Sequence, residues 1–498
     1  MALTQNTVVL ASAGAGKTRR LVECYVSLLA EGADPFTIVA VTFTEKAAAE
    51  LRDRIRTAIY ERISESPPAE KARWIRVLAA LPGAPISTIH GFCGLVLRER
   101  GLEMGIDPSF TILDEQRALD LAREAVVETI REEIRSGAPE ASRLFGDLGL
   151  ETLTQTIIRA STWLNSLGHD GAWLAGRVDD QQAAADLLKE SLAAEMEKYG
   201  PDFETIGELA DEVEARKSRN HPLRKRDDAR ALLPRIGRIA GVRPAAELTR
   251  LTGLSMESFR LRKRAANALD FDDLLIGVRD LLKHFPAIRA HYHGRFRALL
   301  VDEFQDTDEV QAEIIRLLTA DPDATRSEWA FTPGKLFIVG DPKQSIYRFR
   351  RARLQVFMRM MKAVIAQGGA HEHLQDNYRS AAPIVEFSNR LSRSMMDGAG
   401  RESLPDGADT SYRIQFSESD VLKPASNRDF LGITYIVATA GVKARDGRVM
   451  DAEALARLLE GWKTAGKIET WKSVAVLMRT LVNVDIYVDA FEARRIPV

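Results

Sequence analysis

The chain begins with short apolar runs that alternate with longer amphipathic segments. The runs lie at 7–10, 38–42, 86–89, 296–301 and 335–340. Each is bounded by polar or glycine-containing residues, which predicts a buried strand. Apolar residues recur at helical spacing over 21–29, and a helix is also expected over 309–319. Strands that alternate with helices predict an α/β fold with a parallel sheet.

Residues 112–265 have a different pattern, in which Leu, Ala, Glu and Arg dominate and strand signals nearly vanish. We interpret this segment as an all-helical insertion domain. Its two basic clusters are Arg216, Lys217, Arg219, Arg224, Lys225, Arg226 and Arg230, and Arg260, Arg262, Lys263 and Arg264. These residues alone leave two interpretations open, a solvated helix face or contact with phosphate.

A second apparent domain opens near Leu374. Within it, the apolar runs 433–437 and 474–478 predict two more strands, and residues 451–464 predict a helix between them.

Composition narrows the class of protein but does not identify a partner. The 498 residues suggest several domains, and 45% hydrophobic with 28% charged residues is typical of a soluble globular protein. A net charge of −2 means that any DNA-binding surface must be local. Cys24 and Cys93 have no partner motif, which argues against a disulfide framework, a zinc site or an iron–sulfur cluster. We expect a cytoplasmic protein, with no signal segment and no membrane span.

A glycine-containing loop connects the first apolar run to the first helix. Its residues are Ala11, Ser12, Ala13, Gly14, Ala15, Gly16, Lys17 and Thr18. Small residues let the backbone N–H groups point at phosphate oxygens, and the positive end of the helix adds to the attraction. Lys17 can reach the β- and γ-phosphates, and the Thr18 hydroxyl can ligate Mg²⁺. The usual pattern opens with glycine, whereas this loop opens with Ala11, so an ordinary turn before a helix is the alternative.

A carboxylate pair, Asp302 and Glu303, follows the run 296–301. The carboxyl end of a strand is where an α/β sheet places its site. One carboxylate can hold Mg²⁺ while the next polarises an attacking water. The alternative is a capping cluster for the helix at 309–319.

Aromatic residues follow the strands at three places. Phe43 can stack on a base or belong to the core, and His90 considered alone is more often structural. The segment 341–351 interleaves Tyr347 and Phe349 with several arginines. This arrangement suits single-stranded nucleic acid, although an exposed turn with solvated arginines is the alternative.

Taken in order, these segments resemble the superfamily 1 helicases of the UvrD, Rep and PcrA type. Residues 11–18 and 339–350 are most similar to the RecB and AddA motor subunits. The resemblance implies a RecA-like motor domain with a parallel sheet, a helical insertion and a partial second RecA-like domain. The implied divisions are 1–111 and 266–370 for the first motor domain, 112–265 for the insertion, and 371–498 for the incomplete second motor domain.

The resemblance also implies a nucleotide site. Lys17 and Thr18 would bind the phosphates of ATP and its Mg²⁺. Asp302 would bind Mg²⁺, and Glu303 would activate the attacking water.

Three more roles complete the implied motor. Gln344 would sense the γ-phosphate and couple ATP to DNA. Tyr378 would stack on adenine, and Arg379 would be an arginine finger from the second motor domain. Closing and opening the cleft would then drive 3′-to-5′ movement along one DNA strand.

The family contacts single-stranded DNA at positions that match a group of residues after the strands. They are Phe43, Thr44, His90, Tyr347, Phe349 and Arg350. We expect single-stranded DNA and single-strand/double-strand junctions as partners, together with a second helicase–nuclease subunit. The resemblance also favours duplex contact by the basic clusters of the insertion.

Two family motifs are absent, a His-x-x-Lys-Gly-Leu-Glu segment and a Tyr-x-Ala-x-Thr-Arg segment. We therefore expect a truncated chain or a gene fragment. One hypothesis is a DNA-dependent ATPase motor. Another is a nucleotide-gated module that binds single-stranded DNA but unwinds poorly or not at all until it is completed. A third is a P-loop NTPase unrelated to nucleic acid.

Overall fold

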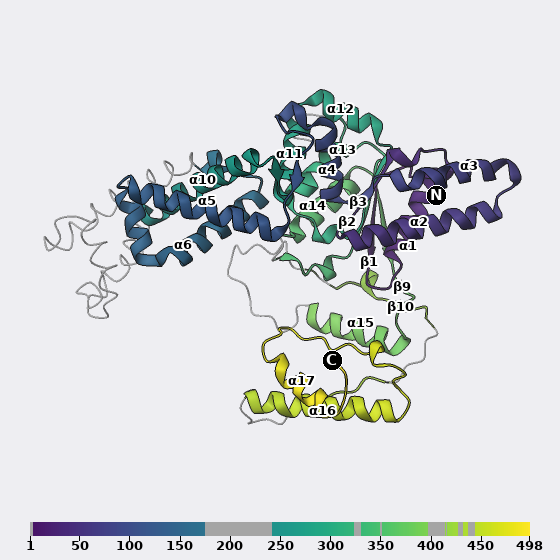
Figure 1. Cartoon of the computed structure of the whole chain (residues 1–498). Helices are drawn as coiled ribbons and strands as arrows, with labels where there is room; N and C mark the ends of the chain where they lie inside the picture. Colours follow the sequence, from purple (N-terminus) through teal and green to yellow (C-terminus); the bar gives the residue numbers. More distant parts are fainter. Residues whose placement is uncertain are drawn as a thin grey trace, which may run out of the picture. The chain divides into compact units, whose positions relative to one another are not determined.

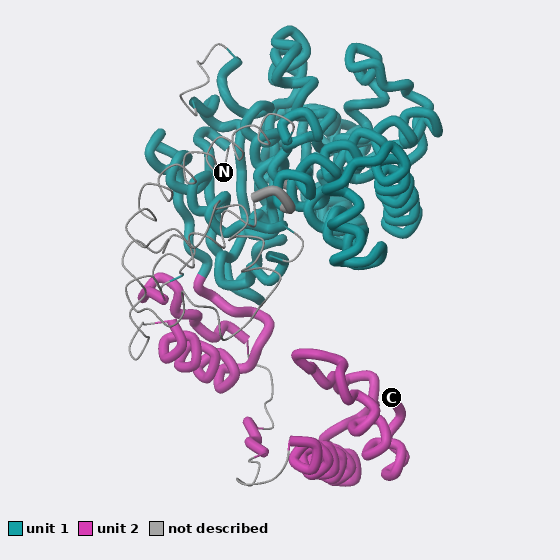
Figure 2. Tube along the Cα trace, turned by 90° about the vertical axis from the view of Figure 1, so that its left-hand side faces the viewer, with its two compact units in different colours: residues 1–374, 402–414 teal, residues 375–401, 415–498 magenta. Residues whose placement is uncertain are grey.

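The computed structural model describes residues 3–174, 242–322, 330–348, 351–396, 414, 416–426, 432–436 and 444–498. The chain divides into two compact units, which Figure 2 colours separately. Unit 1 contains residues 1–374 and 402–414, and unit 2 contains residues 375–401 and 415–498.

A six-stranded parallel sheet forms the centre of unit 1 (Figure 1). Its strands are β1 (Thr7–Ala11), β2 (Ile38–Thr42), β3 (Ile86–Thr88), β6 (Ala298–Val301), β7 (Leu336–Gly340) and β8 (Ala370–Leu374). Their order in the sheet is β3-β2-β6-β7-β1-β8. The predicted α/β fold is therefore confirmed, and β7 lies between β1 and β6 although it follows both in the sequence.

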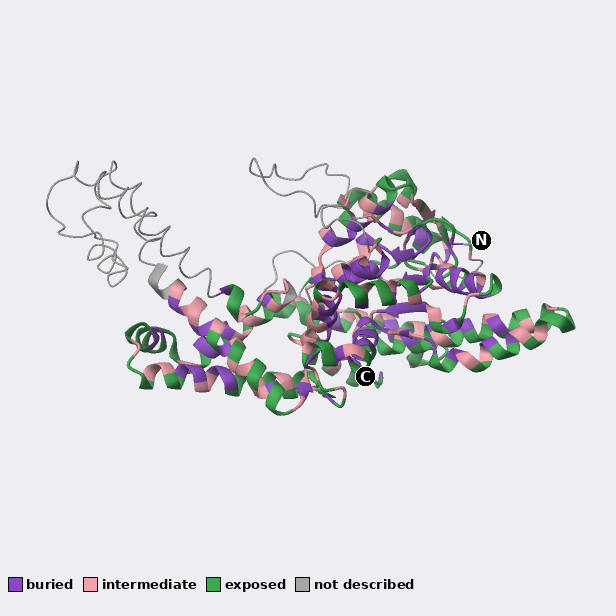
Figure 3. Cartoon of the chain, turned by 90° about the horizontal axis from the view of Figure 1, so that it is seen from above, coloured by how far each residue is buried: buried purple, intermediate pink, exposed green. Residues whose placement is uncertain are grey.

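Helices surround this sheet, whose central strands are apolar on both faces and must be covered. They are α1 (Lys17–Ala30), α2 (Glu45–Glu65), α3 (Pro68–Ala80), α4 (Ile89–Arg100), α11 (Phe271–His284), α12 (Pro286–Arg295), α13 (Glu309–Thr319) and α14 (Leu354–Ala366). Apolar residues of α4, α11, α13 and α14 share one core with Val8, Val39 and Ile338. Figure 3 shows the buried positions gathered along the strands.

Short 3₁₀ helices lie in the connections. They are η1 (Pro35–Thr37), η2 (Leu81–Gly83), η3 (Gly101–Met104), η6 (Phe304–Asp306), η7 (Pro342–Gln344), η9 (Glu418–Asp420) and η10 (Trp471–Ser473). Two of them follow strands of the central sheet: η6 comes just after the predicted pair Asp302 and Glu303, and η7 contains the predicted residue Gln344.

The described part of the insertion is helical, as predicted. It contains α5 (Glu115–Arg135), α6 (Pro139–Ser166) and α10 (Val242–Ala265), whose core includes Val126, Ile157 and Leu251. The chain enters the insertion at β4 (Thr111–Ile112) and leaves it at β5 (Ala268–Leu269). These two short strands pair with each other. The division of the chain into four domain segments stays a prediction.

The two basic clusters of the insertion have different outcomes. The cluster at 216–230 lies outside the described residues. In the second cluster, Lys263 is buried and forms ion pairs with Asp270 and Asp273, both at 2.6 Å. Lys263 is therefore not available to a phosphate, because its ammonium group is enclosed by two carboxylates.

Unit 2 contains α15 (Ala382–Met396), α16 (Ala444–Thr464) and α17 (Val484–Glu492). A small pairing joins β9 (Asp376–Asn377) to β10 (Lys423–Pro424). The strands predicted at 433–437 and 474–478 are not formed in the described residues of these segments, and Val437 lies outside them. In the described part of the chain, residues 474–478 pair with no strand, and Leu477 is 94% exposed. An apolar run by itself does not make a strand, because a strand needs a hydrogen-bonding partner.

No helix in the described ranges is long and apolar enough to cross a membrane. Cys24 and Cys93 are buried, unbonded thiols.

Candidate functional site

The loop after β1 has the backbone that its glycines predict. Gly14 and Gly16 have φ values of 81° and 87°, in the left-handed region that L-residues avoid. The Ala15 N–H donates to the Ser12 carbonyl at 3.1 Å, which closes the turn. Helix α1 starts at Lys17 after a glycine that has no capping side chain, so the N–H groups of its first turn face the loop. The loop therefore forms a concave, positively polarised site for an anion such as a phosphate group.

The alanine at the start of the loop is explained by strand geometry. Ala11 is the last residue of β1 and pairs with Leu374 of β8. Its φ angle is not positive. An extended backbone suits any residue, so glycine is not needed at this position.

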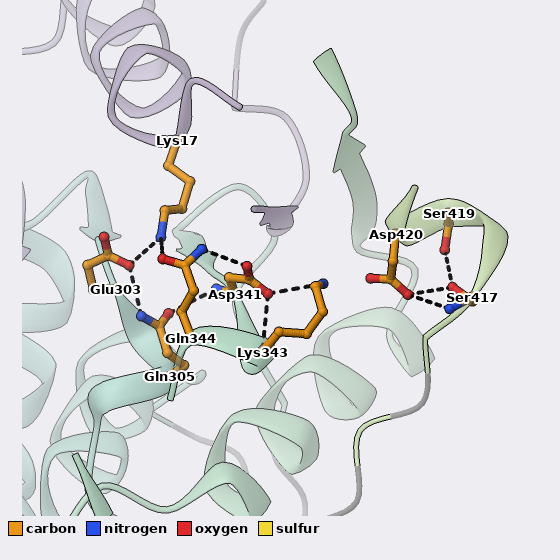
Figure 4. A network of polar contacts seen from close by, with 9 residues as sticks. All are labelled: Lys17, Glu303, Gln305, Asp341, Lys343, Gln344, Ser417, Ser419 and Asp420. Atoms are coloured by element: carbon orange, nitrogen blue, oxygen red, sulfur yellow. Dashed lines mark hydrogen bonds and ion pairs between the residues drawn. The ribbon is translucent and has the colours of Figure 1, made fainter. Parts of the chain in front are cut away.

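The Lys17 side chain points towards two of the segments that follow strands (Figure 4). Its Nζ lies 2.6 Å from Glu303 Oε2 and 3.5 Å from Gln344 Oε1. Lys17 is 9% exposed, so its ammonium group is held in a largely buried position beside the loop.

The acidic pair lies at the end of β6, as predicted. The Asp302 N–H donates to the Val41 carbonyl at 2.9 Å, which fixes Asp302 beside β2. Burial, with the Glu303 carboxylate adding to it, raises the pKa of Asp302 to about 6. Glu303 has a left-handed backbone with φ 50°, a conformation that disfavours a non-glycine residue by about 1–3 kcal/mol. Asp308, not the acidic pair, caps α13, since its Oδ1 accepts the Gln311 N–H at 2.8 Å.

Several oxygen donors at this edge fit a magnesium ion. Asp302 is buried, and Asp306 Oδ1 is a buried carboxylate oxygen that has no hydrogen-bond partner. Thr18, in the first turn of α1, contributes a hydroxyl. The described residues contain no cluster of three or more His, Cys, Asp and Glu side chains arranged around a metal ion. Mg²⁺ needs no such cluster, because it binds through one or two carboxylates together with phosphate oxygens and water.

Gln344 belongs to the segment after β7. Its Nε2 donates to Asp341 Oδ2 at 2.6 Å, and Asp341 Oδ1 accepts from the Lys343 N–H and pairs with Lys343 Nζ at 3.0 Å. The amide of Gln344 is therefore oriented with its oxygen towards Lys17.

Aromatic residues gather at the same edge of the sheet. Phe43, after β2, stacks on Tyr347 with ring centroids 4.8 Å apart. His90, in the first turn of α4, meets the edge of Phe271 at 5.3 Å. Flat apolar groups in this arrangement can stack with nucleic-acid bases. Thr44 is the N-cap of α2, because its Oγ1 accepts the Ala47 N–H at 3.1 Å. Phe349 and Arg350 lie outside the described residues.

A family model described as "UvrD/REP helicase N-terminal domain" matches residues 1–364. The chain belongs to this family. Its sheet is therefore the RecA-like core that membership of this family implies.

Curated relatives of this UvrD/REP-type chain are longer than the chain itself. An ATP-dependent helicase/nuclease subunit from Ligilactobacillus salivarius is 24% identical over 99% of this chain and 47% of the relative. The protein of the same name from Geobacillus kaustophilus is 29% identical over 84% of this chain and 41% of the relative. The exonuclease/helicase protein RexA of Streptococcus pneumoniae is 26% identical over 79% of this chain and 38% of the relative. The chain thus spans less than half the length of these relatives.

Two predicted residues of this UvrD/REP-type chain, Tyr378 and Arg379, lie in unit 2. Both are exposed, and the Arg379 N–H donates to Asn377 Oδ1 at 3.0 Å. Their roles at adenine and phosphate stay predictions.

The structure adds two residues that the sequence analysis did not select. Phe271 is 45% exposed at the start of α11, next to His90. Gln305 is buried between the acidic pair and Asp341. No motif in the sequence marks Phe271, because it does not directly follow a predicted strand. Gln305 lies two residues after Glu303 in the sequence but carries no charge.

Proposed function

We propose that this chain is the ATP-binding part of an AddA-type DNA helicase, which moves 3′ to 5′ along single-stranded DNA. One observation carries the proposal. Lys17, Glu303 and Gln344, from three separate strand ends, meet within hydrogen-bond distance. The aromatic residues Phe43, His90 and Tyr347 follow strands at the same edge of the sheet. The family membership supports the same proposal.

In this proposal the loop 11–18 holds the phosphates of ATP through backbone N–H groups, and Lys17 neutralises the charge that develops on the γ-phosphoryl group. Glu303 accepts the proton of the attacking water. Asp302 and Thr18 would hold Mg²⁺, which supplies charge neutralisation on the phosphate oxygens. Gln344 lies within reach of both Lys17 and Asp341, so its amide can respond to the phosphate.

Arg379 would complete the transition-state charge stabilisation from unit 2. A residue of this kind contributes roughly 10³–10⁵ in rate. The relatives are named as subunits of helicase/nucleases, which supports two further proposals. The chain would work on DNA with a second helicase–nuclease subunit, and it would act at single-strand/double-strand junctions.

A second candidate is a nucleotide-gated module that binds single-stranded DNA with little turnover. The exposed apolar segment of unit 2 around Leu477 favours it, because such a surface is typical of one that another polypeptide covers. In this second proposal, a partner subunit supplies the polypeptide that covers this segment.

The test is the ATPase rate with and without a single-stranded oligonucleotide, measured for the wild type, Lys17→Ala and Arg379→Ala. Lys362→Ala and Arg390→Ala remove a positive charge from exposed helix positions and serve as matched controls. Strong stimulation that is lost only in the two site variants supports the motor. Nucleotide-dependent DNA binding without turnover supports the second candidate. ATP turnover that DNA leaves unchanged contradicts both and favours an NTPase unrelated to nucleic acid.

Polarity needs a separate experiment. Strand displacement from a duplex with a 3′ single-stranded tail, against one with a 5′ tail, distinguishes the direction of movement. Displacement of the 5′-tailed substrate alone contradicts the proposed 3′-to-5′ direction.

A further inference from the structure

Gln305 is part of the polar network in Figure 4, where it lies next to Glu303. It lies in η6 and is 2% exposed. Its Nε2 donates to Glu303 Oε2 at 2.8 Å and to Asp306 Oδ2 at 3.3 Å. Its Oε1 accepts the Asp341 N–H at 2.9 Å. One buried amide therefore joins the segment after β6 to the segment after β7.

These contacts close a ring of hydrogen bonds. Starting from Lys17, the ring passes through Glu303, Gln305, Asp341 and Gln344 and returns to Lys17. A second bond reinforces it, from the Ser345 hydroxyl to the Gln305 carbonyl at 3.2 Å. The ring contains Lys17, Glu303 and Gln344, the three residues that act on ATP in the proposed function.

Gly340, the last residue of β7, leaves room for the Gln305 side chain. A Cβ on Gly340 would lie 2.8 Å from Gln305 Oε1 and 2.9 Å from the Phe357 ring. Real Cβ atoms do not approach so closely, so any other residue at 340 would displace the Gln305 side chain. Glycine at this position allows the close approach of an amide to a backbone N–H.

Only an amide satisfies all partners of this position. The two carboxylates require a donor, and the Asp341 N–H requires an acceptor. A glutamate at 305 would keep the acceptor but would replace the donor by a third negative oxygen. A methionine would leave the buried Asp341 N–H unpaired, which is unfavourable.

We propose that Gln305 is a positioning residue for ATP hydrolysis. It holds the Glu303 carboxylate, whose left-handed backbone needs an external restraint, in the orientation that activates water. It also fixes the backbone of Asp341, so that Glu303 and Gln344 move as one body. The inference rests on the proposed function and extends it from the reacting groups to the residue that aligns them.

The experiment compares Gln305→Glu and Gln305→Met with the wild type. Gln311→Glu, on the neighbouring helix α13, is the matched control, because it makes the same chemical change outside the ring. The readouts are kcat and KM for ATP with saturating single-stranded DNA, the affinity for a fluorescent ATP analogue, and the melting temperature. We expect kcat of Gln305→Glu to fall about 100-fold, the scale of a misaligned catalytic group. KM and analogue affinity should change less than about threefold.

Three results would overturn the proposal. They are a kcat within about threefold of the wild type, an equal fall in Gln311→Glu, and a loss of analogue binding that accompanies the fall in kcat. The last result would assign Gln305 a purely structural role. Gln305→Met provides a second check, because it removes the donor without adding charge and should show the same split between kcat and KM.

The proposed function can fail separately. If the wild type binds the analogue but does not turn it over, the same variants are compared by the change in single-stranded DNA affinity that the analogue produces. Loss of that change in Gln305→Glu, with analogue affinity retained, supports the role of Gln305. An unchanged response overturns it.

Discussion

At the scale of single residues, backbone conformation distinguishes positions that look alike in the sequence. Ala11 and Gly16 are both small residues of the loop that we propose to bind phosphate. Ala11 is extended at the end of β1, whereas Gly16 has φ 87° and begins the first helix. A Cβ at Gly16 meets nothing nearer than 4.0 Å, so a substitution there is strained by conformation and not by a clash.

We therefore expect Gly16→Ala to weaken nucleotide binding and Ala11→Gly to leave it nearly unchanged. The left-handed conformation disfavours alanine by roughly 1–2 kcal/mol, which pulls the N–H groups of the loop out of position. A fall of about tenfold in affinity for a fluorescent ATP analogue is expected for Gly16→Ala. Equal affinities of the two variants would contradict this interpretation of the loop.

Phe271 gives a second residue-scale prediction. Replacing it by alanine removes an exposed aromatic face beside His90, and a lost base–aromatic stack is worth about 1–3 kcal/mol. We expect weaker binding of a single-stranded oligonucleotide, measured by fluorescence anisotropy, with ATP-analogue affinity retained. Tyr60→Ala is the control, because Tyr60 is similarly exposed on α2. A similar loss in both variants would argue against a specific role for Phe271.

At the scale of elements, a buried ion cluster joins the insertion to the core. Lys263, in the last turn of α10, pairs with Asp270 and Asp273, which also form the capping box of α11. Burial, with Asp270 adding to it, raises the pKa of Asp273 to about 6. The lysine is therefore needed to compensate two carboxylates away from water.

Lys263→Met should reduce the free energy of unfolding by about 3–5 kcal/mol, because it leaves the two carboxylates buried without a counter-charge. Adding Asp273→Asn to the same chain should recover part of the loss. Arg262→Met, on the same helix, is the control and should have little effect. Urea unfolding followed by circular dichroism measures all four proteins. A double variant no more stable than Lys263→Met would contradict the charge argument.

The N-cap of α13 gives a prediction about pH. Burial raises the pKa of Asp308 from 3.8 to about 6. Between these values the folded state binds a proton that the unfolded state has released, so this group stabilises the fold less as pH rises. Asp308→Asn keeps a capping oxygen but does not titrate. Its stability relative to the wild type should increase by about 1 kcal/mol from about pH 5 to about pH 7.5, measured by urea unfolding. A difference that does not change with pH would refute the assignment.

At the scale of the whole molecule, the two units differ in how their apolar segments are paired. In unit 1, β7 lies between two strands and is buried throughout. In unit 2, residues 475–478 belong to no strand, although they are as apolar as a core strand. Backbone amides without a hydrogen-bonded partner exchange with solvent at the rate of an open chain.

Hydrogen exchange of the whole chain should therefore show slow exchange for peptides that cover 336–340 and fast exchange for peptides that cover 475–478. The comparison is internal, because both segments are short and apolar. Protection of 475–478 equal to that of β7 would mean that this segment is paired in solution. Protection that appears only when a second subunit is added would identify the partner that covers it.

The accuracy of the sequence predictions follows from how each strand is buried. β1, β2 and β7 were predicted to within one residue at each end, because central parallel strands are apolar on both faces. Strand β8, with the sequence Ala-His-Glu-His-Leu, was missed because an edge strand needs no such pattern.

The sequence by itself determined the features that depend on neighbouring residues in the chain. The glycines of the loop, the acidic pair after β6 and the cap of α2 each depend on a few neighbouring residues. The tertiary structure alone decided which of these segments meet. Lys17 and Glu303 are 286 positions apart, and only the insertion of β7 between β1 and β6 brings Gln344 to them. The spacing along the chain carries no information about that contact, because parallel strands are paired through crossovers whose length is not constrained.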